Sequence, residues 1–144
     1  MGQYVLVPVD GSNHSEKAFK YVLDNIPESK IILLNVINPV SIIGDDDDDY
    51  FDLETYQNEI KRQRKRAEKM LEDYRSTAME QGIEVETILT TGKPARQILE
   101  TADTIDIDQI VMGSRGRSGI GRVLFGSVAE TVTRRATVPV TIVR

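Results

Sequence analysis

Cysteine is absent from the 144 residues of this chain. That absence excludes a disulfide framework and any metal site built on thiolates. No apolar run comes near the roughly 18 residues that a membrane-spanning helix requires, so we expect no contact with a membrane. The chain also has no excess of positive charge, since 23 Asp and Glu residues against 18 Lys and Arg residues give a formal net charge of −5. A basic surface of the kind that binds nucleic acid is therefore not expected.

The first residues of the chain lack the features of a targeting segment. The apolar run Tyr4–Val9 ends immediately at Asp10, unlike the apolar core of a signal peptide. Leu6 occupies the position at which a myristoylation motif has Ser or Thr. We therefore expect a cytoplasmic protein. The length, with 40% hydrophobic and 28% charged residues, predicts one globular domain over residues 1–144.

Apolar and polar residues follow patterns that predict strands and helices in turn. Runs of branched apolar residues bounded by polar ones predict strands, and apolar residues at spacings of three and four predict helices. Strands that are joined by helices of about ten residues or more have to be parallel. The pattern therefore predicts an open, doubly wound α/β sheet with helices on both faces. The expected strands are Tyr4–Val9, Lys30–Val36, Ile83–Leu89, Asp108–Met112 and Val138–Val143, and the helices begin near Asn13, Leu53, Pro94 and Ser127.

Residues at the expected helix ends predict how the helices begin and stop. Asn13 with Glu16, and Ser127 with Glu130, have the spacing of capping pairs. Gly82 suits the position after the end of a long helix over 53–81. Apolar residues form one stripe along that helix, at Leu53, Ile60, Ala67, Leu71, Tyr74 and Ala78.

Two charged stretches have both a structural and a functional interpretation. The consecutive aspartates Asp45–Asp49 are expected to form a solvated loop, with weak cation attraction as the alternative. A basic cluster on the long helix could contact nucleic acid, but acidic residues lie among its members and no aromatic residues are available for base stacking. We interpret this cluster as a solvated helix face; it comprises Lys61, Arg62, Arg64, Lys65, Arg66 and Lys69.

The last expected strand has features of a sheet edge. Val138–Val143 is apolar on both faces, and Pro139 lacks the N–H that a central strand would use in its ladder. An apolar edge strand promotes aggregation unless something covers it. We therefore predict a homodimer that pairs this strand across a two-fold axis.

A glycine-rich basic loop links the fourth strand to the last helix. Glycine lets the backbone turn with positive φ or approach a ligand closely. The N–H groups and the dipole of a helix N-terminus favour an anion such as phosphate. The sequence therefore predicts an anion site here. The loop holds Gly113, Gly116, Gly119, Gly121 and Gly126 together with Arg115, Arg117 and Arg122.

The predicted topology brings three distant positions together. Asp10 follows the first strand, Val36 ends the second and Gly113 follows the fourth. Ligands of open α/β sheets bind outside the carboxyl ends of the strands, where the strand order reverses. We expect these three residues to line one crevice.

These residues resemble the universal stress proteins. The family signature is glycine, two residues, glycine, nine residues, and then glycine with Ser or Thr, which matches Gly113, Gly116, Gly126 and Ser127. The start Val7–Ser12, the turn Gly92–Ala95 and the ending Val138–Val143 are also similar. The resemblance implies a Rossmann-like sheet of the adenine nucleotide alpha hydrolase type, with strand order 3-2-1-4-5. It further implies dimers through the last strand and membership of an ATP-binding subgroup.

The resemblance also implies a role for individual residues. Asp10 and Val36 would face the adenosine, with Pro8 and Val9 shaping the base pocket. Mg or Mn would be bound mainly through the phosphates. The remaining contacts to ribose and phosphates would come from Met112, Gly113, Arg115 and Gly116, and from Gly126, Ser127 and Val128 at the last helix.

Simpler structural roles are open for some of these residues. Ser127 could be only an N-cap, and Asp10 could cap the first helix. His14 has no evident base or metal partner in the sequence, so we assign it no catalytic role. The leading hypothesis is a dimeric, ATP-binding stress-response module. The alternative is a slow ATPase or autophosphorylating enzyme, because phosphoryl transfer depends mainly on positioning and charge. A pure interaction module with an empty pocket is the third interpretation.

Overall fold

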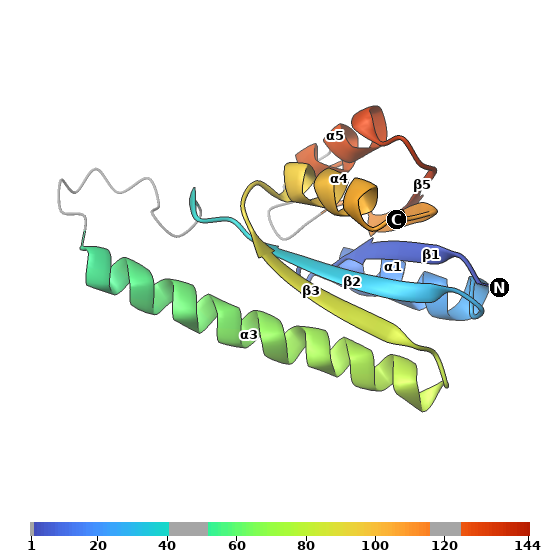
Figure 1. Cartoon of the computed structure of the whole chain (residues 1–144), viewed down its shortest axis with the longest axis horizontal. Helices are drawn as coiled ribbons and strands as arrows, with labels where there is room; N and C mark the ends of the chain where they lie inside the picture. Colours follow the sequence, from blue (N-terminus) through green and yellow to red (C-terminus); the bar gives the residue numbers. More distant parts are fainter. Residues whose placement is uncertain (1, 41–51, 116–124) are drawn as a thin grey trace.

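Five parallel strands form an open sheet in the order β3-β2-β1-β4-β5 in the computed structural model (Figure 1). The structure describes residues 2–40, 52–115 and 125–144. It confirms the predicted α/β class and strand order. The elements are β1 Tyr4–Pro8, α1 Asn13–Asn25, β2 Lys30–Ile37, α3 Leu53–Glu80, β3 Val85–Thr91, α4 Pro94–Thr104, β4 Gln109–Gly113, α5 Ser127–Arg135 and β5 Val140–Val143.

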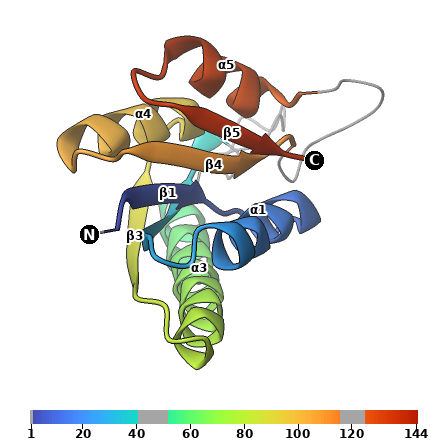
Figure 2. The same ribbon diagram turned by 90° about the vertical axis from the view of Figure 1, so that its right-hand side faces the viewer.

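Helices cover both faces of the sheet, with α1 and α3 on one side and α4 and α5 on the other (Figure 2). Each strand therefore buries both sets of alternating side chains. Val5 and Val7 of β1 pack toward α1 and α3, whereas Leu6 between them belongs to the second apolar cluster, with Ile98 and Val132. This double burial explains why the strands read as nearly continuous apolar runs.

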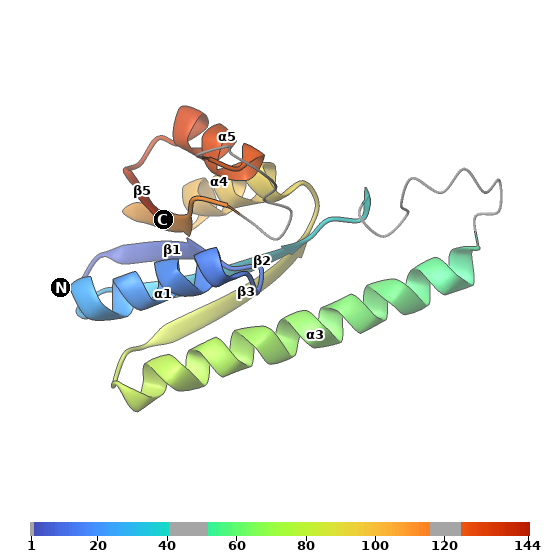
Figure 3. The same cartoon turned by 180° about the vertical axis from the view of Figure 1, so that it is seen from behind.

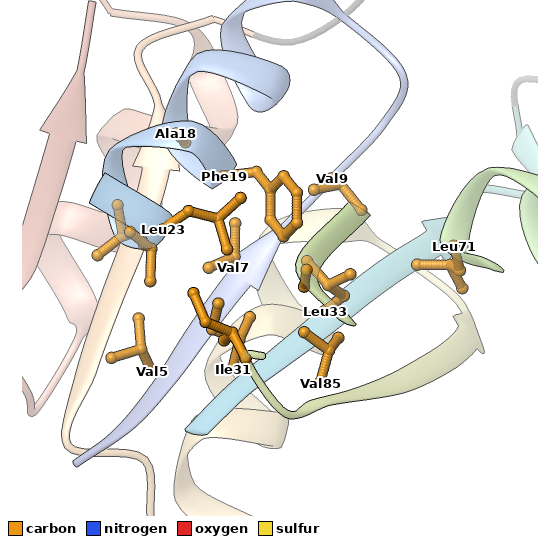
Figure 4. Close-up of a cluster of buried hydrophobic side chains, with 14 residues drawn as sticks. Val5, Val7, Val9, Ala18, Phe19, Leu23, Ile31, Leu33, Leu71 and Val85 are labelled. Atoms are coloured by element: carbon orange, nitrogen blue, oxygen red, sulfur yellow. The ribbon is translucent and has the colours of Figure 1, made fainter. Parts of the chain in front are cut away.

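Phe19 is the largest side chain of the cluster under α1 and α3. It lies among Val9, Leu33 and other branched residues (Figure 4). Its ring meets that of Tyr74 edge to face, with the ring centroids 4.8 Å apart and the planes at 81°. Because Tyr74 belongs to α3, this contact joins the two helices of that face.

The strand registers bring the carboxyl ends of the central strands to one edge. Tyr4 of β1 pairs with Lys30 of β2, and Pro8 pairs with Leu34. Beyond the last pair, the Val9 amide donates to the Leu34 carbonyl at 2.8 Å, which extends the pairing to the edge of the crevice. The predicted convergence of chain segments at this edge is confirmed.

Helix α3 is much longer than the sheet that it covers. Its N-terminal part extends past the carboxyl ends of β2 and β3 (Figures 1 and 3). The buried residues are Ala67, Leu71 and Ala78, all in the C-terminal half. The predicted stripe is wrong at Leu53, which is 57% exposed because no strand lies beneath it. The end of the helix is as predicted, since Gly82 has φ of +72°.

Both predicted capping pairs are wrong by one residue. The N-cap of α1 is Ser12, whose hydroxyl accepts from the Ser15 amide at 3.2 Å. The N-cap of α5 is Gly126, with no side-chain cap, and Ser127 is already helical. The cap is the last residue with extended backbone. When several polar residues adjoin, the tertiary path of the chain decides which one it is.

The two ends of the sheet are β3 and β5. The edge position predicted for β3 is confirmed. Strand β5 is shorter than predicted, because Val138 and Pro139 precede it. Pro139 nevertheless takes part in pairing, since its carbonyl accepts from the Ile110 amide at 2.9 Å. Within the described residues, no helix is long and apolar enough to cross a membrane.

Candidate functional site

A cavity of about 810 Å³ opens at the carboxyl edge of the sheet. This volume lies in the range typical of small-molecule sites. The cavity brings together every predicted site residue that the structure describes, whereas Gly116 lies outside the described residues. Those residues are Pro8, Val9, Asp10, Val36, Met112, Gly113, Arg115, Gly126, Ser127 and Val128.

The turn after β1 is held in place by hydrogen bonds between residues close in sequence. Asp10 accepts from the Ser12 amide at 2.9 Å, and the Asp10 amide donates to the Ser15 hydroxyl at 3.3 Å. The Ser15 hydroxyl in turn donates to the Ser12 carbonyl at 3.1 Å. The Asp10 carboxylate thus has a defined position at the wall of the cavity. It orders the turn before α1, while Ser12 is the residue that caps the helix.

Asn35 is a buried polar residue of this site that sequence reasoning missed. Its side-chain amide donates to the Val9 carbonyl at 2.7 Å, linking the ends of β1 and β2. Asn35 also lines the cavity. The available signal was one amide within the otherwise apolar run of β2, because a buried polar side chain needs a hydrogen-bond partner.

The ends of the glycine-rich loop are held close together. The Gly126 amide donates to the Ser114 carbonyl at 2.7 Å, and the Ser114 amide donates to the Val143 carbonyl at 3.0 Å. Helix α5 therefore begins beside the end of β4, with its first turn at the cavity. No side chain caps this helix start. Its first N–H groups and the Arg115 side chain together provide an environment suited to an anion.

Two carboxylates, Asp10 and Glu130, are among the described residues that line the cavity. Glu130 forms an ion pair with Arg134 one turn further along α5. Within residues 2–40, 52–115 and 125–144, no group of three or more His, Cys, Asp or Glu side chains could hold a metal ion. The described part of the protein therefore offers no metal cage of its own.

Helix α3 contributes a wall that the sequence analysis did not foresee. The residues concerned are Gln63, Arg66, Ala67 and Met70. Their spacing of three, four and seven places them on one face of the helix. Arg66 is exposed, as are the other members of the basic cluster, which agrees with the predicted solvated face. What the prediction lacked is that Arg66 also borders the cavity. The missed signal was that the cavity face continues the buried stripe of Ala67 and Leu71.

Tyr74 follows Met70 by one turn of α3 and forms a hydrogen bond with Ser15 in the turn at Asp10. Burial raises the pKa of the Tyr74 phenol above its ordinary value, and the charges of Glu16 and Asp10 act in the same direction. A hydrogen bond with Ser15 lowers this pKa in part. The phenol is thus neutral in the physiological range and holds Ser15, which positions the Asp10 amide.

Comparison with known proteins identifies the family. The model of the universal stress protein family matches residues 1–144. The chain belongs to this family. The universal stress protein YxiE of Bacillus subtilis is 34% identical over 147 residues, covering 97% of each protein.

Solved structures of universal stress proteins share the fold. Protein MJ0577 of Methanocaldococcus jannaschii superposes with a TM-score of 0.83 at 29% identity, over 99% of this chain and 96% of that one. A universal stress protein of Arabidopsis thaliana, determined with AMP bound, has a TM-score of 0.71 at 21% identity, over 98% of this chain and 90% of that one. At 21% identity the likeness shows the fold alone.

Proposed function

We propose that this universal stress protein binds ATP in the cavity at the carboxyl edge of its sheet and acts as a nucleotide-dependent stress-response module. The observation that carries the proposal is the cavity itself. It is lined both by Asp10, which carries a carboxylate, and by the first turn of α5, which no side chain caps. These groups suit the two ends of a nucleotide, since a carboxylate accepts from ribose or base donors and a helix N-terminus attracts phosphate.

In this proposal, the cavity residues fall into two groups, one at the adenosine and one at the ribose and phosphates. Asp10 and Val36 face the adenosine, and Pro8 and Val9 shape the pocket for the base. Magnesium or manganese is held mainly through the phosphates, consistent with the absence of a carboxylate cluster among the described residues. Ribose and phosphates lie against Met112, Gly113, Arg115, Gly116, Gly126, Ser127 and Val128.

Binding rather than rapid turnover is the function that this arrangement favours. Hydrolysis of a phosphoanhydride bond needs a group that positions or activates water. Among the described cavity residues, Glu130 is the carboxylate on the phosphate side, and its ion pair with Arg134 occupies it. We therefore place slow ATP hydrolysis or autophosphorylation second.

Release and titration of the nucleotide test the proposal. The purified protein is denatured and the supernatant is separated by ion-exchange chromatography, where ATP or ADP is expected. The nucleotide-free protein is then titrated calorimetrically with ATP, with and without Mg²⁺. Absence of a released nucleotide together with no measurable ATP affinity contradicts the proposed function.

Replacing Asp10 by asparagine is expected to weaken ATP binding about tenfold. The amide keeps an oxygen that can accept from the Ser12 amide, so the turn before α1 stays intact. It loses the charged acceptor, and hydrogen bonds to charged groups contribute about 1.5–3 kcal/mol. The matched control is Asp24→Asn, an exposed carboxylate on α1. An unchanged dissociation constant for D10N would remove Asp10 from the site.

We also propose a homodimer that forms through the C-terminal strand, Val138–Val143. Strand β5 lies at the end of the sheet, and its side chains are all half-buried. An edge with this much apolar surface is stabilised by pairing with a second copy. Sedimentation equilibrium at micromolar concentration is expected to give twice the mass of the chain, and a monomer there contradicts the dimer.

A further inference from the structure

The wall contributed by α3 lies outside the glycine signature and outside the strand ends. The helix packs on β2 and β3, and its N-terminal part continues past them (Figure 3). Where the sheet ends, the same helix face that buries Ala67 and Leu71 lines the cavity with Gln63 and Arg66. The cavity is therefore bounded on this side by side chains that no strand supports.

Arg66 differs from the other basic residues of its cluster. Of Lys61, Arg62, Arg64, Lys65, Arg66 and Lys69, it alone lines the cavity. Arg62 forms an ion pair with Glu59 one turn away. Arg66 has no ion-pair partner among the residues that the structure describes, so its guanidinium is available to a ligand.

Helix α3 packs on β2 and β3, so Arg66 lies on the side of the cavity away from β4 and β5. The start of α5 adjoins the ends of β4 and β5, because the Gly126 amide donates to the Ser114 carbonyl and the Ser114 amide donates to the Val143 carbonyl. The α3 wall instead adjoins the turn after β1. The Met70 sulfur lies 3.2 Å from the point that a Cβ would occupy if Gly11 carried a side chain. In the proposed function this is the adenosine end of the site, beside Asp10.

We infer that Arg66 covers the base of the bound nucleotide, with its planar guanidinium against the purine ring and Gln63 beside it. This inference rests on the proposed function and extends it, because it assigns a base-recognising residue outside the family signature. A guanidinium stacks favourably on aromatic faces, and the interaction is stronger where water is excluded. Arg66 thus selects a ligand that carries an aromatic base over a bare polyphosphate.

The test compares three ligands on the full-length protein: ATP, adenosine and inorganic tripolyphosphate. Calorimetric titrations are made with the wild type, Arg66→Ala, Arg66→Lys and the control Arg64→Ala, which removes an exposed arginine outside the cavity. Arg66→Ala is expected to weaken the binding of ATP and of adenosine by the same factor, about tenfold, while the binding of tripolyphosphate is unaffected. Arg66→Lys keeps the positive charge but loses the planar guanidinium, so its binding of ATP and adenosine is expected to be as weak as that of Arg66→Ala. The control binds like the wild type.

Other outcomes overturn the inference in distinguishable ways. Unchanged binding of ATP and adenosine by Arg66→Ala removes Arg66 from the site and leaves the proposed function in place. Weaker binding of ATP and tripolyphosphate with adenosine unchanged makes Arg66 a phosphate ligand, and the loss then shrinks in high salt because screening weakens charge contacts. Wild-type affinity for ATP and adenosine in Arg66→Lys contradicts stacking of the guanidinium on the base. If the wild type itself binds neither ATP nor adenosine, the proposed function fails and the inference fails with it.

Discussion

Replacing Gly113 by alanine is expected to lower the free energy of unfolding by about 3 kcal/mol. A Cβ at this position would lie 2.6 Å from the backbone carbonyl carbon of His14 and 2.7 Å from its oxygen. These are backbone atoms, so the start of α1 has to move away from β4, and overpacking of this kind costs about 1–3 kcal/mol or more. Urea denaturation followed by circular dichroism measures the loss.

A glycine can be required because a side chain would clash or because the backbone has a positive φ. Glycine-to-alanine substitutions at positions 113 and 82 distinguish these two causes. Gly82 has φ of +72° and open space around it, so Gly82→Ala strains the backbone without a clash. We expect that variant to lose about 1 kcal/mol, from the left-handed conformation alone. Equal losses at the two positions would contradict close packing of α1 on β4. Close approach of a ligand would then be the reason that remains for a glycine at position 113.

The second large effect is expected from Phe19→Ala, which should destabilise the protein by about 3–5 kcal/mol. Phe19 is 2% exposed and contacts Tyr74 of α3 edge to face. Removing the ring leaves a cavity between α1 and α3, and the surrounding residues fill it only in part. The measurement is again the urea midpoint, with the slope of the transition as a check on two-state unfolding.

Two further variants serve as controls for Phe19→Ala. Tyr21→Ala removes an aromatic ring from the solvent side of α1, where Tyr21 is 37% exposed, and is expected to change stability by about 0.5 kcal/mol or less. If Phe19→Ala does not fold, Phe19→Leu keeps most of the volume and should lose about 1.5 kcal/mol. A loss of the same size at Tyr21 and Phe19 would show that the contact with α3 contributes little.

The topology could be predicted because it depends on local patterns and on chain connectivity. Runs such as Lys30–Ile37 are apolar on both faces, which only a strand covered on both sides satisfies. Helices between such strands make them parallel, and the resemblance implied their order. What these patterns do not specify is where an element begins or ends in detail, and the caps at Ser12 and Gly126 were each misplaced by one residue.

Much of the candidate site followed from the same reasoning. Carboxyl ends of parallel strands share one edge, so Asp10, Val36 and Gly113 line the same cavity although they are far apart in the chain. Asn35 was missed because its partner, the Val9 carbonyl, lies just past the end of the neighbouring strand β1. Arg66 was missed because its surroundings depend on how far α3 extends beyond the sheet.

The sequence by itself determined the fold class, the helical and extended segments, and the glycine spacing that marks the family. These depend on hydrophobic periodicity and on backbone conformations that only certain residues adopt, which are properties of neighbouring residues. The tertiary structure alone decided which face of α3 becomes a wall of the cavity and why Gly113 has no room for a side chain. Both depend on packing between segments distant in sequence, where the length of one helix and the approach of another set the space available.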